Sequence, residues 1–475
     1  MSRTVIVSGA RTPIGKLSGA FASLSAQDLG GYAIKGALER AGISGELVDA
    51  VLMGQVIQAG QGQITARQAA VSGGVPMSVN ATTINKVCLS GLQTIYLADL
   101  MIKAGEADIV IAGGMESMTN APYLLPGARA GYRIGDQSVI DSMMFDGLTC
   151  AFDHCAMGLG TENYNGGKIS RQRQDEFSAR SHQLAAAAIA AGKFDNEIVG
   201  VSIPQRKGEP IVVTVDEGVR GDTTAESLGG LRPAFTKDGT ITAGNASQIS
   251  DGGAAVLVMS EAKAKELGLT PLGEIVSYGQ VAGPDASLLL QPANAIAKAA
   301  AKAGIDPRSI DLFEMNEAFA AVGLASTDQL GVDPDSLGDP ELKERLRTET
   351  DAAIAKAIAW LDRDQRPDGF WVGMLIVLGL LFWFGYRAPL TGAPLFVDPK
   401  VNFEIVIGPA IVLGLVQVAG FIILSHFALL YAGAGRTAVL TYTMPFWMLL
   451  FAWLMMNERV RGLQWACISL GAAGL

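Results

Sequence analysis

Residues 81–104 have the sequence ATTINKVCLSGLQTIYLADLMIKA, in which an extended stretch at 81–84 leads through a short turn into an apolar helical run at 92–101. Cys88 lies in that turn. A thiol at the start of a helix faces free backbone N–H groups and the positive end of the helix dipole, which favour thiolate over thiol. The position therefore suits a nucleophile, with a small buried core cysteine as the alternative.

Short apolar stretches alternate with amphipathic or alanine-rich stretches on both sides of this turn. The expected strands include 5–7, 50–53 and 109–112, and the expected helices include 29–41 and 91–104. This alternation predicts an α/β domain whose sheet is largely buried.

An internal repeat supports the same fold class. Ala41-Gly42-Ile43, preceded by a helical stretch and followed by an apolar one, recurs 262 positions later as Ala303-Gly304-Ile305. Both copies predict a helix, an AGI turn and then a strand ending near Met53 or Met315. We expect two related halves, with chance similarity among common residues as the alternative.

Charge and the N-terminal sequence restrict the class of protein. The net charge is -10 and the isoelectric point is about 5.0, so no basic surface is expected to bind nucleic acid. The first residues, MSRTVIVSGARTP, contain no apolar signal segment. Residues 1–373 are therefore expected in the cytoplasm.

The cysteines are expected to be free thiols. Their spacing shows neither a CxxC pair nor a dense disulfide framework; the positions are 88, 150, 155 and 467. Cys150 and Cys155 flank His154, but a structural metal site needs about four ligands. Because only two other histidines exist, His182 and His426, we expect no metal.

The composition changes abruptly near Gly369. From that residue to position 475, five Lys or Arg and three Asp or Glu occur in 107 residues. Four apolar runs follow, at 370–386, 405–430, 437–456 and 463–475. The second and third reach the length of about 20 residues that a membrane-spanning helix needs, with a buried core helix as the alternative. We expect an all-α C-terminal region at 374–475 that associates with a membrane through transmembrane helices.

Five short motifs in the first part of the chain are the basis of a family resemblance. They are RTPIG at 11–15, NKVCLSG at 85–91, GGMESM at 113–118, TAGNAS at 242–247 with DG at 251–252, and NEAFA at 316–320. With these motifs in this order, residues 1 to about 335 resemble thiolases, the acyl-CoA acetyltransferases.

The resemblance implies a duplicated thiolase fold with an incomplete second half. The first half would comprise 1–118 and 250–270, an inserted loop domain 119–249, and the truncated second half 271–335. The implied reaction moves an acyl group onto a cysteine and then to coenzyme A, or joins two acetyl units by Claisen condensation. Acyl-CoA and CoA would be the substrates, no cofactor would be bound permanently, and the chain would form a homo-oligomer.

The resemblance also assigns roles to individual residues. Cys88 would be the nucleophile that carries the acyl group, and Asn316 would hold a water molecule in an oxyanion hole. The residues that would line the coenzyme A path are Leu148, Met157, Arg220, Phe235, Ala243, Ser247, Ala318 and Phe319. Small side chains in this set suit a narrow tunnel for pantetheine.

Two catalytic groups that the resemblance requires are missing from the sequence. A thiolase uses a histidine in a Gly-His-Pro motif as base and a second cysteine in a Cys-x-Gly-Gly-Gly loop as acid and base. No histidine occurs between 182 and 426, and Cys467, the only cysteine beyond 155, has no glycine triplet after it. The repeat agrees, because adding 262 to Cys88 gives Thr350. The second half is therefore expected to stop before its own nucleophile turn, which would leave its strands without partners.

Other resemblances cover the rest of the chain. Residues 336–373 are expected to form a helical linker, and about 341–373 resemble squalene-hopene cyclases through Gln365, Gly369 and Trp371. The acidic motif of a cyclase is absent, so no cyclase activity is expected, and an amphipathic linker helix is the alternative. Residues 422–475 resemble EamA-type transporters through AGAGRTA at 432–438, MPFW at 444–447 and NER at 457–459.

Three functional hypotheses follow from the sequence. The first is a thiolase-type acyltransferase that is inactive or impaired because its active site is incomplete. The second is a membrane-embedded transporter-like protein. The third is a non-functional chimeric fusion with junctions near 335, 374 and 422.

Overall fold

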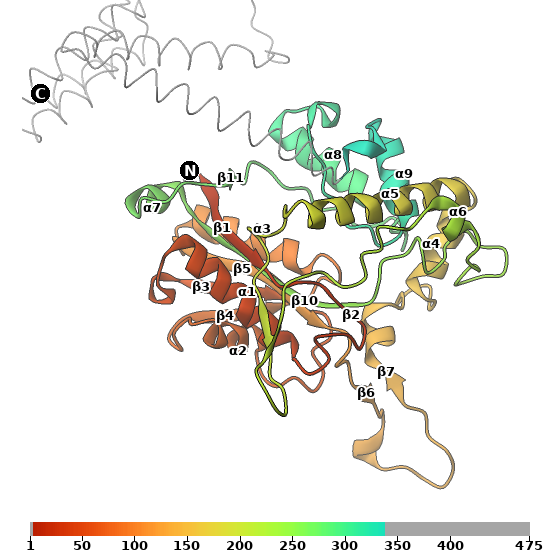
Figure 1. The fold of residues 1–475 in the computed structure, drawn as a ribbon, viewed down its shortest axis with the longest axis horizontal. Coiled ribbons are helices and arrows are strands. Elements are labelled where there is room, and N and C mark those ends of the chain that lie inside the picture. The colour runs from red at the N-terminus through yellow and green to blue at the C-terminus, as the bar shows by residue number, and fades with distance from the viewer. Residues whose placement is uncertain (1–2, 338–475) are drawn as a thin grey trace, which may run out of the picture. The chain divides into compact units, whose positions relative to one another are not determined.

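The computed structural model describes residues 3–337, and a seven-stranded mixed sheet is the centre of their N-terminal part (Figure 1). The strand order is β11-β1-β10-β5-β3-β4, and β2 pairs with β10 beside this path. The strands are β1 (Thr4–Arg11), β2 (Gly15–Lys16), β3 (Ala50–Gly54), β4 (Asn80–Ile84), β5 (Ile109–Ser117), β10 (Ser250–Ser260) and β11 (Gly273–Glu274).

Parallel and antiparallel pairs occupy different parts of the sheet. β3 pairs in parallel with β4 and β5, while β10 runs antiparallel to β5 and β1. All five residues of β3 are buried, as expected of a strand covered on both faces. The predicted α/β domain with a largely buried sheet is confirmed.

Helices cover both faces of this sheet. Alternate side chains of β3 point to opposite faces, so Met53 packs in the core under α1 (Ala26–Ala41) and α2 (Thr65–Ser72). Leu52 packs instead with the residues of α3 (Ser90–Ala104), such as Ile102. The layer under α3 positions the start of that helix, where Cys88 lies.

The ends of α1 follow the local sequence. Ser25 accepts a hydrogen bond from the backbone N–H of Asp28, whose side chain in turn accepts from the N–H of Ser25, which forms a capping box. Gly42 ends the helix with φ at 67°, a left-handed conformation that glycine adopts without a steric cost.

A second packed region is helical. Its main helices are α4 (Met157–Asn165), α5 (Arg171–Ala190), α6 (Ala225–Gly229), α8 (Gln291–Ala303) and α9 (Ala320–Leu330). Figure 1 shows α5, α8 and α9 close together, and a core cluster that includes Phe177 and Leu324, with Ile296 packed against it, joins them. Eight of the eleven residues of α9 are buried. This helical packing holds the segment that leads into α9.

Smaller elements complete the described residues. They are β6 (Tyr123–Leu124), β7 (Ile140–Asp141), β8 (Val201–Ile203), β9 (Ile211–Val213) and α7 (Glu261–Glu266). β6 pairs with β7 and β8 with β9, each as a two-stranded sheet.

The repeat is confirmed in its helix and turn but not in its strand. Gly304 ends α8 with φ at 71°, as Gly42 ends α1. Residues 311–316 form no strand, and Phe313 makes only an isolated parallel bridge to Leu337. The first copy has β4 and β5 as hydrogen-bonding neighbours, whereas the positions 262 residues after them lie beyond 337. The prediction of a strand near Met315 was therefore wrong for residues 3–337, because a strand needs paired backbone groups.

Within residues 3–337, one helical stretch, Val87–Ala104, is long and apolar enough to cross a membrane by length and composition alone. The core helix of a globular domain passes the same test, and α3 packs on the sheet. The predicted linker beyond 337, the cyclase-like segment at 341–373 and the four apolar runs lie outside the described residues.

Candidate active site

The turn that carries Cys88 is held by side chains of its own sequence. The Asn85 Oδ1 atom accepts a hydrogen bond of 2.9 Å from the backbone N–H of Val87. Ser90 Oγ accepts from the N–H of Lys86 at 2.8 Å and donates to the carbonyl of Val87 at 2.6 Å. Val87 has φ at 49°, a left-handed conformation that costs a β-branched residue about 1–3 kcal/mol. The hydrogen bonds fix this strained turn and with it the position of Cys88.

The chemical environment of Cys88 differs from the sequence prediction. The residue is exposed at the helix start, yet desolvation of its sulfur raises the pKa of the thiol, and a backbone hydrogen bond offsets this only in part. The predicted preference for thiolate was therefore wrong, because desolvation outweighs the backbone hydrogen bond that lowers the pKa. Since the residue as a whole is exposed, water still screens the sulfur. A proton acceptor is needed to activate this thiol near neutral pH.

Glu116 holds the loop that follows β3, next to the turn that carries Cys88. One carboxylate oxygen accepts from the backbone N–H groups of Val56 at 2.8 Å and Ile57 at 3.3 Å. The carbonyl of Val56 accepts from the side-chain amide of Asn85 at 3.3 Å. Desolvation raises the pKa of Glu116 to about 7, although these N–H groups lower it, and Asp251 raises it further. Through this loop Glu116 is connected to Asn85, whose side chain holds the turn that carries Cys88.

The segment after β11 packs against α3. The rings of Tyr96 and Tyr278 meet edge to face, with centroids 4.2 Å apart. Lys86 donates to the side-chain oxygens of Gln93 at 2.9 Å and Gln280 at 2.6 Å. These contacts join the nucleophile turn to the start of the second half.

A cavity of about 440 Å³ brings together three of the residues predicted to bind coenzyme A. Arg220, Ala243 and Ser247 all line it, and His182 and Glu317 lie in the same wall. Cys88 is not among its lining residues. The cavity is therefore lined by three of the eight predicted binding residues but not by the nucleophile.

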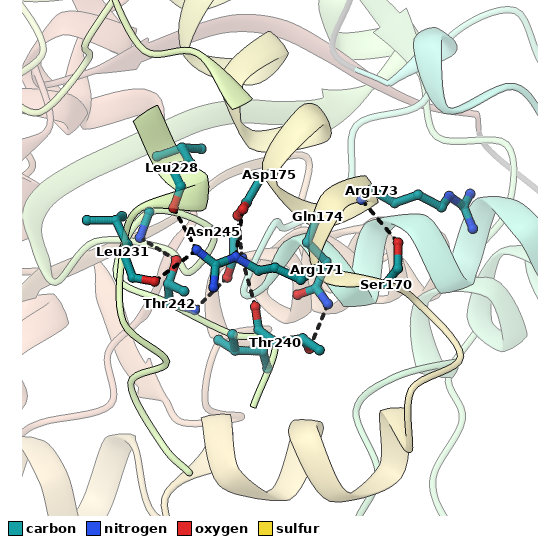
Figure 2. A network of polar contacts seen from close by, with 12 residues as sticks. Ser170, Arg171, Arg173, Gln174, Asp175, Leu228, Leu231, Thr240, Thr242 and Asn245 are labelled. Atoms are coloured by element: carbon teal, nitrogen blue, oxygen red, sulfur yellow. Dashed lines mark hydrogen bonds and ion pairs between the residues drawn. The ribbon is translucent and has the colours of Figure 1, made fainter. Parts of the chain in front are cut away.

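A buried polar network holds the segment that carries Ala243 and Ser247 (Figure 2). Asn245 donates from its side-chain amide to Asp175 at 2.9 Å and to the carbonyl of Thr240 at 3.1 Å. Its Oδ1 atom accepts from the N–H of Thr242 at 2.8 Å. Figure 2 also shows Arg171, whose guanidinium contacts Asp175 at 2.6 Å. The network attaches the segment to α5.

Four of the remaining five predicted binding residues form an apolar group beside this segment. Met157, Phe235, Ala318 and Phe319 belong to one core cluster with Ile241. The rings of Phe235 and Phe319 meet at nearly right angles, with centroids 6.1 Å apart.

Backbone contacts connect the two groups of predicted residues. The N–H of Met157 donates to the carbonyl of Leu148 at 2.9 Å, and that of Ser247 donates to the carbonyl of Ala318 at 3.1 Å. All eight residues predicted for the coenzyme A path are thus linked by the cavity, the apolar cluster or these bonds.

Asn316 lies apart from these contacts. It is exposed in the segment before α9, and within residues 3–337 no hydrogen bond joins it to Cys88. The two predicted catalytic residues are therefore not linked directly. Among residues 3–337, no group of three or more His, Cys, Asp or Glu is arranged to hold a metal ion.

Two polar residues in or near the site were missed by the sequence analysis. His182 accepts from the N–H of Arg220 at 3.4 Å, and desolvation followed by the charge of Arg220 lowers the pKa of its imidazole. Glu317 accepts from the hydroxyl of Ser181 at 2.9 Å, and desolvation raises the pKa of its carboxyl group. Glu317 stands inside the NEAFA motif, but only burial in the fold reveals its environment.

Comparison with known proteins covers nearly the whole chain. Residues 4–262 match the N-terminal domain of thiolase, residues 269–340 its C-terminal domain, and residues 369–475 the EamA-like transporter family. The cyclase resemblance at 341–373 has no support among these matches and stays a prediction.

Several relatives are similar to the first part of the chain. A "Probable acetyl-CoA acetyltransferase" of Mycolicibacterium smegmatis is 58% identical over 331 residues, which cover 70% of this chain and 85% of that protein. An acetyl-CoA acetyltransferase of Cupriavidus necator is 52% identical over 338 residues, with 70% and 85% covered. A "Probable acetyl-CoA acyltransferase" of Staphylococcus aureus is 50% identical over 342 residues, with 71% and 86% covered. On the fold, the arranged motifs and these matches, the chain belongs to the thiolase family.

Proposed function

We propose that the chain is a thiolase-type acyltransferase in which Cys88 accepts an acyl group from acyl-CoA but complete turnover is lost or severely reduced. In the acylation step the sulfur of Cys88 attacks the thioester carbonyl, a new carbon–sulfur bond forms, and coenzyme A leaves as a thiolate that takes up a proton. The observation that carries the proposal is the strained turn that fixes Cys88 at the start of α3. Such strain concentrates at functional sites.

Coenzyme A would bind along the linked set of residues. Arg220 offers positive charge and hydrogen-bond donors that suit phosphate, and Ala243 and Ser247 leave room beside it for a narrow chain. Met157, Phe235 and Phe319 offer an apolar surface for the acyl end. Leu148 and Ala318 complete the path, and no permanently bound cofactor is needed for this step.

Loss of turnover follows from the missing bases. The thiol of Cys88 needs an acceptor for its proton, because its pKa is raised. His182 lines the cavity and Cys88 does not, and no hydrogen bond among the described residues joins the two. Losing general-base assistance costs about 10²- to 10⁴-fold in rate. Asn316 would still position a water at the acyl carbonyl, but without the second cysteine the carbon–carbon step lacks its base.

The proposed domain limits are those of a thiolase with an incomplete second half, and the proposed assembly is a homo-oligomer. Residues 1–118 with 250–270 form the first half, 119–249 the loop domain and 271–335 the truncated second half. Within the described residues the second half pairs only through β11, with β1, and has no counterpart of β3, β4 and β5. The thiolase part would lie in the cytoplasm as a homo-oligomer.

Two assays of the full-length protein in detergent separate acylation from turnover. Exchange of labelled CoA into acetyl-CoA needs only acylation and its reversal, and we expect slow exchange that Cys88→Ala abolishes. Thiolysis of acetoacetyl-CoA is expected to stay at the level of Cys88→Ala. Rapid, Cys88-dependent thiolysis would refute the impairment. Equal exchange in the wild type and in Cys88→Ala would show that Cys88 is not the nucleophile.

The match to the EamA-like transporter family supports a second candidate function. Residues 369–475 would insert into a membrane and form part of a transport path by pairing with other copies, because transport sites usually lie between repeats. Membrane fractionation tests the insertion. Recovery of the folded full-length chain without detergent, in the supernatant after ultracentrifugation, would contradict it.

The third candidate, an artificial or mis-assembled chimeric fusion without function, predicts a specific result. Resequencing the coding DNA across the junctions near 335, 374 and 422 would then fail to recover one continuous reading frame. A continuous frame at all three positions would contradict it.

A further inference from the structure

Cys150 and Cys155 face each other across a hairpin. Thr149 and Ala156 form an antiparallel bridge, and the next pair inward is linked by a hydrogen bond of 2.9 Å from the N–H of Cys150 to the carbonyl of Cys155. Opposite residues of an antiparallel pair point to the same face, with Cα atoms about 5.5 Å apart when hydrogen-bonded. This spacing lies inside the range of about 4.4–6.8 Å that a disulfide spans.

The turn between the two cysteines is already closed. The N–H of His154 donates to the carbonyl of Cys150 at 3.0 Å, and His154 has φ at 50°. This left-handed residue brings the chain back so that four residues, 151–154, separate the pair. Bringing the sulfurs together therefore needs little further ordering of the backbone.

The surroundings of the two sulfurs leave them open to reaction. The N–H of Asp153 donates to the Cys150 Sγ atom at 3.3 Å, which orients this sulfur within the hairpin. Gly160 faces Cys155: a Cβ atom added at this glycine would lie 3.7 Å from the Cys155 Sγ atom. Because glycine has no side chain, the space beside the sulfur stays open. Both cysteines are free and half-buried, and the tip residue Phe152 is 85% exposed. A small oxidant in solution can therefore reach the pair.

We propose that Cys150 and Cys155 form a reversible intramolecular disulfide when the protein meets a peroxide. The Cys150 thiolate attacks one peroxide oxygen, the O–O bond breaks, and sulfenic acid and hydroxide form. The Cys155 sulfur then attacks the sulfenic sulfur, the S–S bond forms, and water leaves with the thiol proton. In total two thiols lose two hydrogens, and one hydrogen peroxide becomes two waters. A dithiol in solution reverses the reaction by exchange.

The disulfide would brace a functionally placed hairpin. Its base carries Leu148 and Met157, joined by a backbone hydrogen bond of 2.9 Å. This consequence rests on the proposed function, because both residues belong to the proposed coenzyme A path. The formation of the bond does not depend on coenzyme A.

Peptide mapping tests the bond directly. The reduced full-length protein is treated with hydrogen peroxide, remaining thiols are blocked with N-ethylmaleimide, and the chain is cleaved before Asp153 without reductant. We expect the fragments that contain Cys150 and Cys155 to stay joined, and to separate with a gain of two hydrogens after reduction. Cys150→Ser and Cys155→Ser should each abolish the joined species, and only Cys155→Ser should leave sulfenic acid, trapped by dimedone, on Cys150.

A second arm tests the contribution of the fold. Oxidation of the native protein should form the bond about tenfold faster, or more, than oxidation of the same chain in urea, because the hairpin pre-orders the pair. Equal rates would overturn the proposal. The proposal would also be overturned if N-ethylmaleimide modified both cysteines after peroxide treatment. A disulfide from either cysteine to Cys88, or one formed only between two chains, would overturn it as well.

Discussion

The carboxylate of Asp175 accepts a hydrogen bond of 2.9 Å from the side-chain amide of Asn245, and the two residues are 2% and 3% exposed. This contact joins α5 to the segment 242–247. Because that segment carries Ala243 and Ser247, the shape of the cavity depends on a polar contact that water does not reach.

Asp175→Ala is expected to destabilise the protein by about 1–3 kcal/mol, because the partly buried guanidinium of Arg171 loses its carboxylate partner. Asn245 would lose a partner as well. Urea unfolding measured by pulse proteolysis gives the change in free energy. Asp328→Ala is the matched control, since its pair with Arg173 is 46% and 42% exposed and should contribute about 0–1 kcal/mol. Equal effects of the two substitutions would contradict the importance of the network.

Gly158→Ala is expected to disturb the apolar part of the proposed path. A Cβ atom at Gly158 would lie 2.1 Å from the ring of Phe235, so the ring must move. Overpacking of this kind costs about 1–3 kcal/mol, and thermal unfolding should show a lower midpoint. Gly229→Ala in α6 is the control, because a Cβ atom there meets nothing within 4 Å. An unchanged midpoint for Gly158→Ala would mean that the Phe235 ring is not fixed.

Alkylation of Cys88 by iodoacetamide should depend steeply on pH. The pKa of the thiol is raised by desolvation, so thiol predominates at neutral pH and the rate should rise as the pH passes the raised pKa. A Cys88→Ser sample corrects for the other cysteines. A rate that is already maximal at neutral pH would show a stabilised thiolate and contradict this environment.

Glu116 should make stability fall as the pH rises. Its pKa is about 7 in the folded protein and about 4.3 in an unfolded chain, so the folded state binds more protons between these values. The contribution is therefore most favourable at low pH and is lost as the pH rises to about 7, by on the order of 1–3 kcal/mol. Glu116→Gln resembles the protonated form and should flatten this dependence in urea unfolding.

The control for Glu116 is an exposed glutamate. Glu39 is 66% exposed in its pair with Lys35, and Glu39→Gln should leave the pH dependence of the wild type unchanged. A Glu116→Gln protein with the same dependence as the wild type would show that Glu116 is not desolvated.

The sequence predicted the elements whose signals are local. The stretches expected as helices at 29–41 and 91–104 lie within α1 and α3. Their signals, apolar periodicity and end residues, act over a few helical turns and can be read from the local sequence. The strand expected near Met315 did not form within the described residues. Its stability depends on distant neighbours, which no local pattern of residues records.

Three of the residues predicted for the coenzyme A path line one cavity, whereas the energetics of this part of the fold were not predictable. Arg220 and Ser247 were both expected on the coenzyme A path from the family resemblance, and both line one cavity. The roles of Asp175 and Glu116 depend on burial, which brings together residues far apart in the sequence. The direction of the pKa shift of Cys88 was predicted wrongly for the same reason, because desolvation is a property of the folded chain.

The most direct measurement of the central claim is the mass of the Cys88 peptide after the full-length protein is incubated with acetyl-CoA and quenched in acid. The account predicts that an acetyl group accumulates slowly on Cys88, is released by hydroxylamine as expected of a thioester, and is absent from Cys88→Ala. No acetyl group on Cys88 after prolonged incubation, with the protein still folded, would contradict the claim that this residue is the nucleophile.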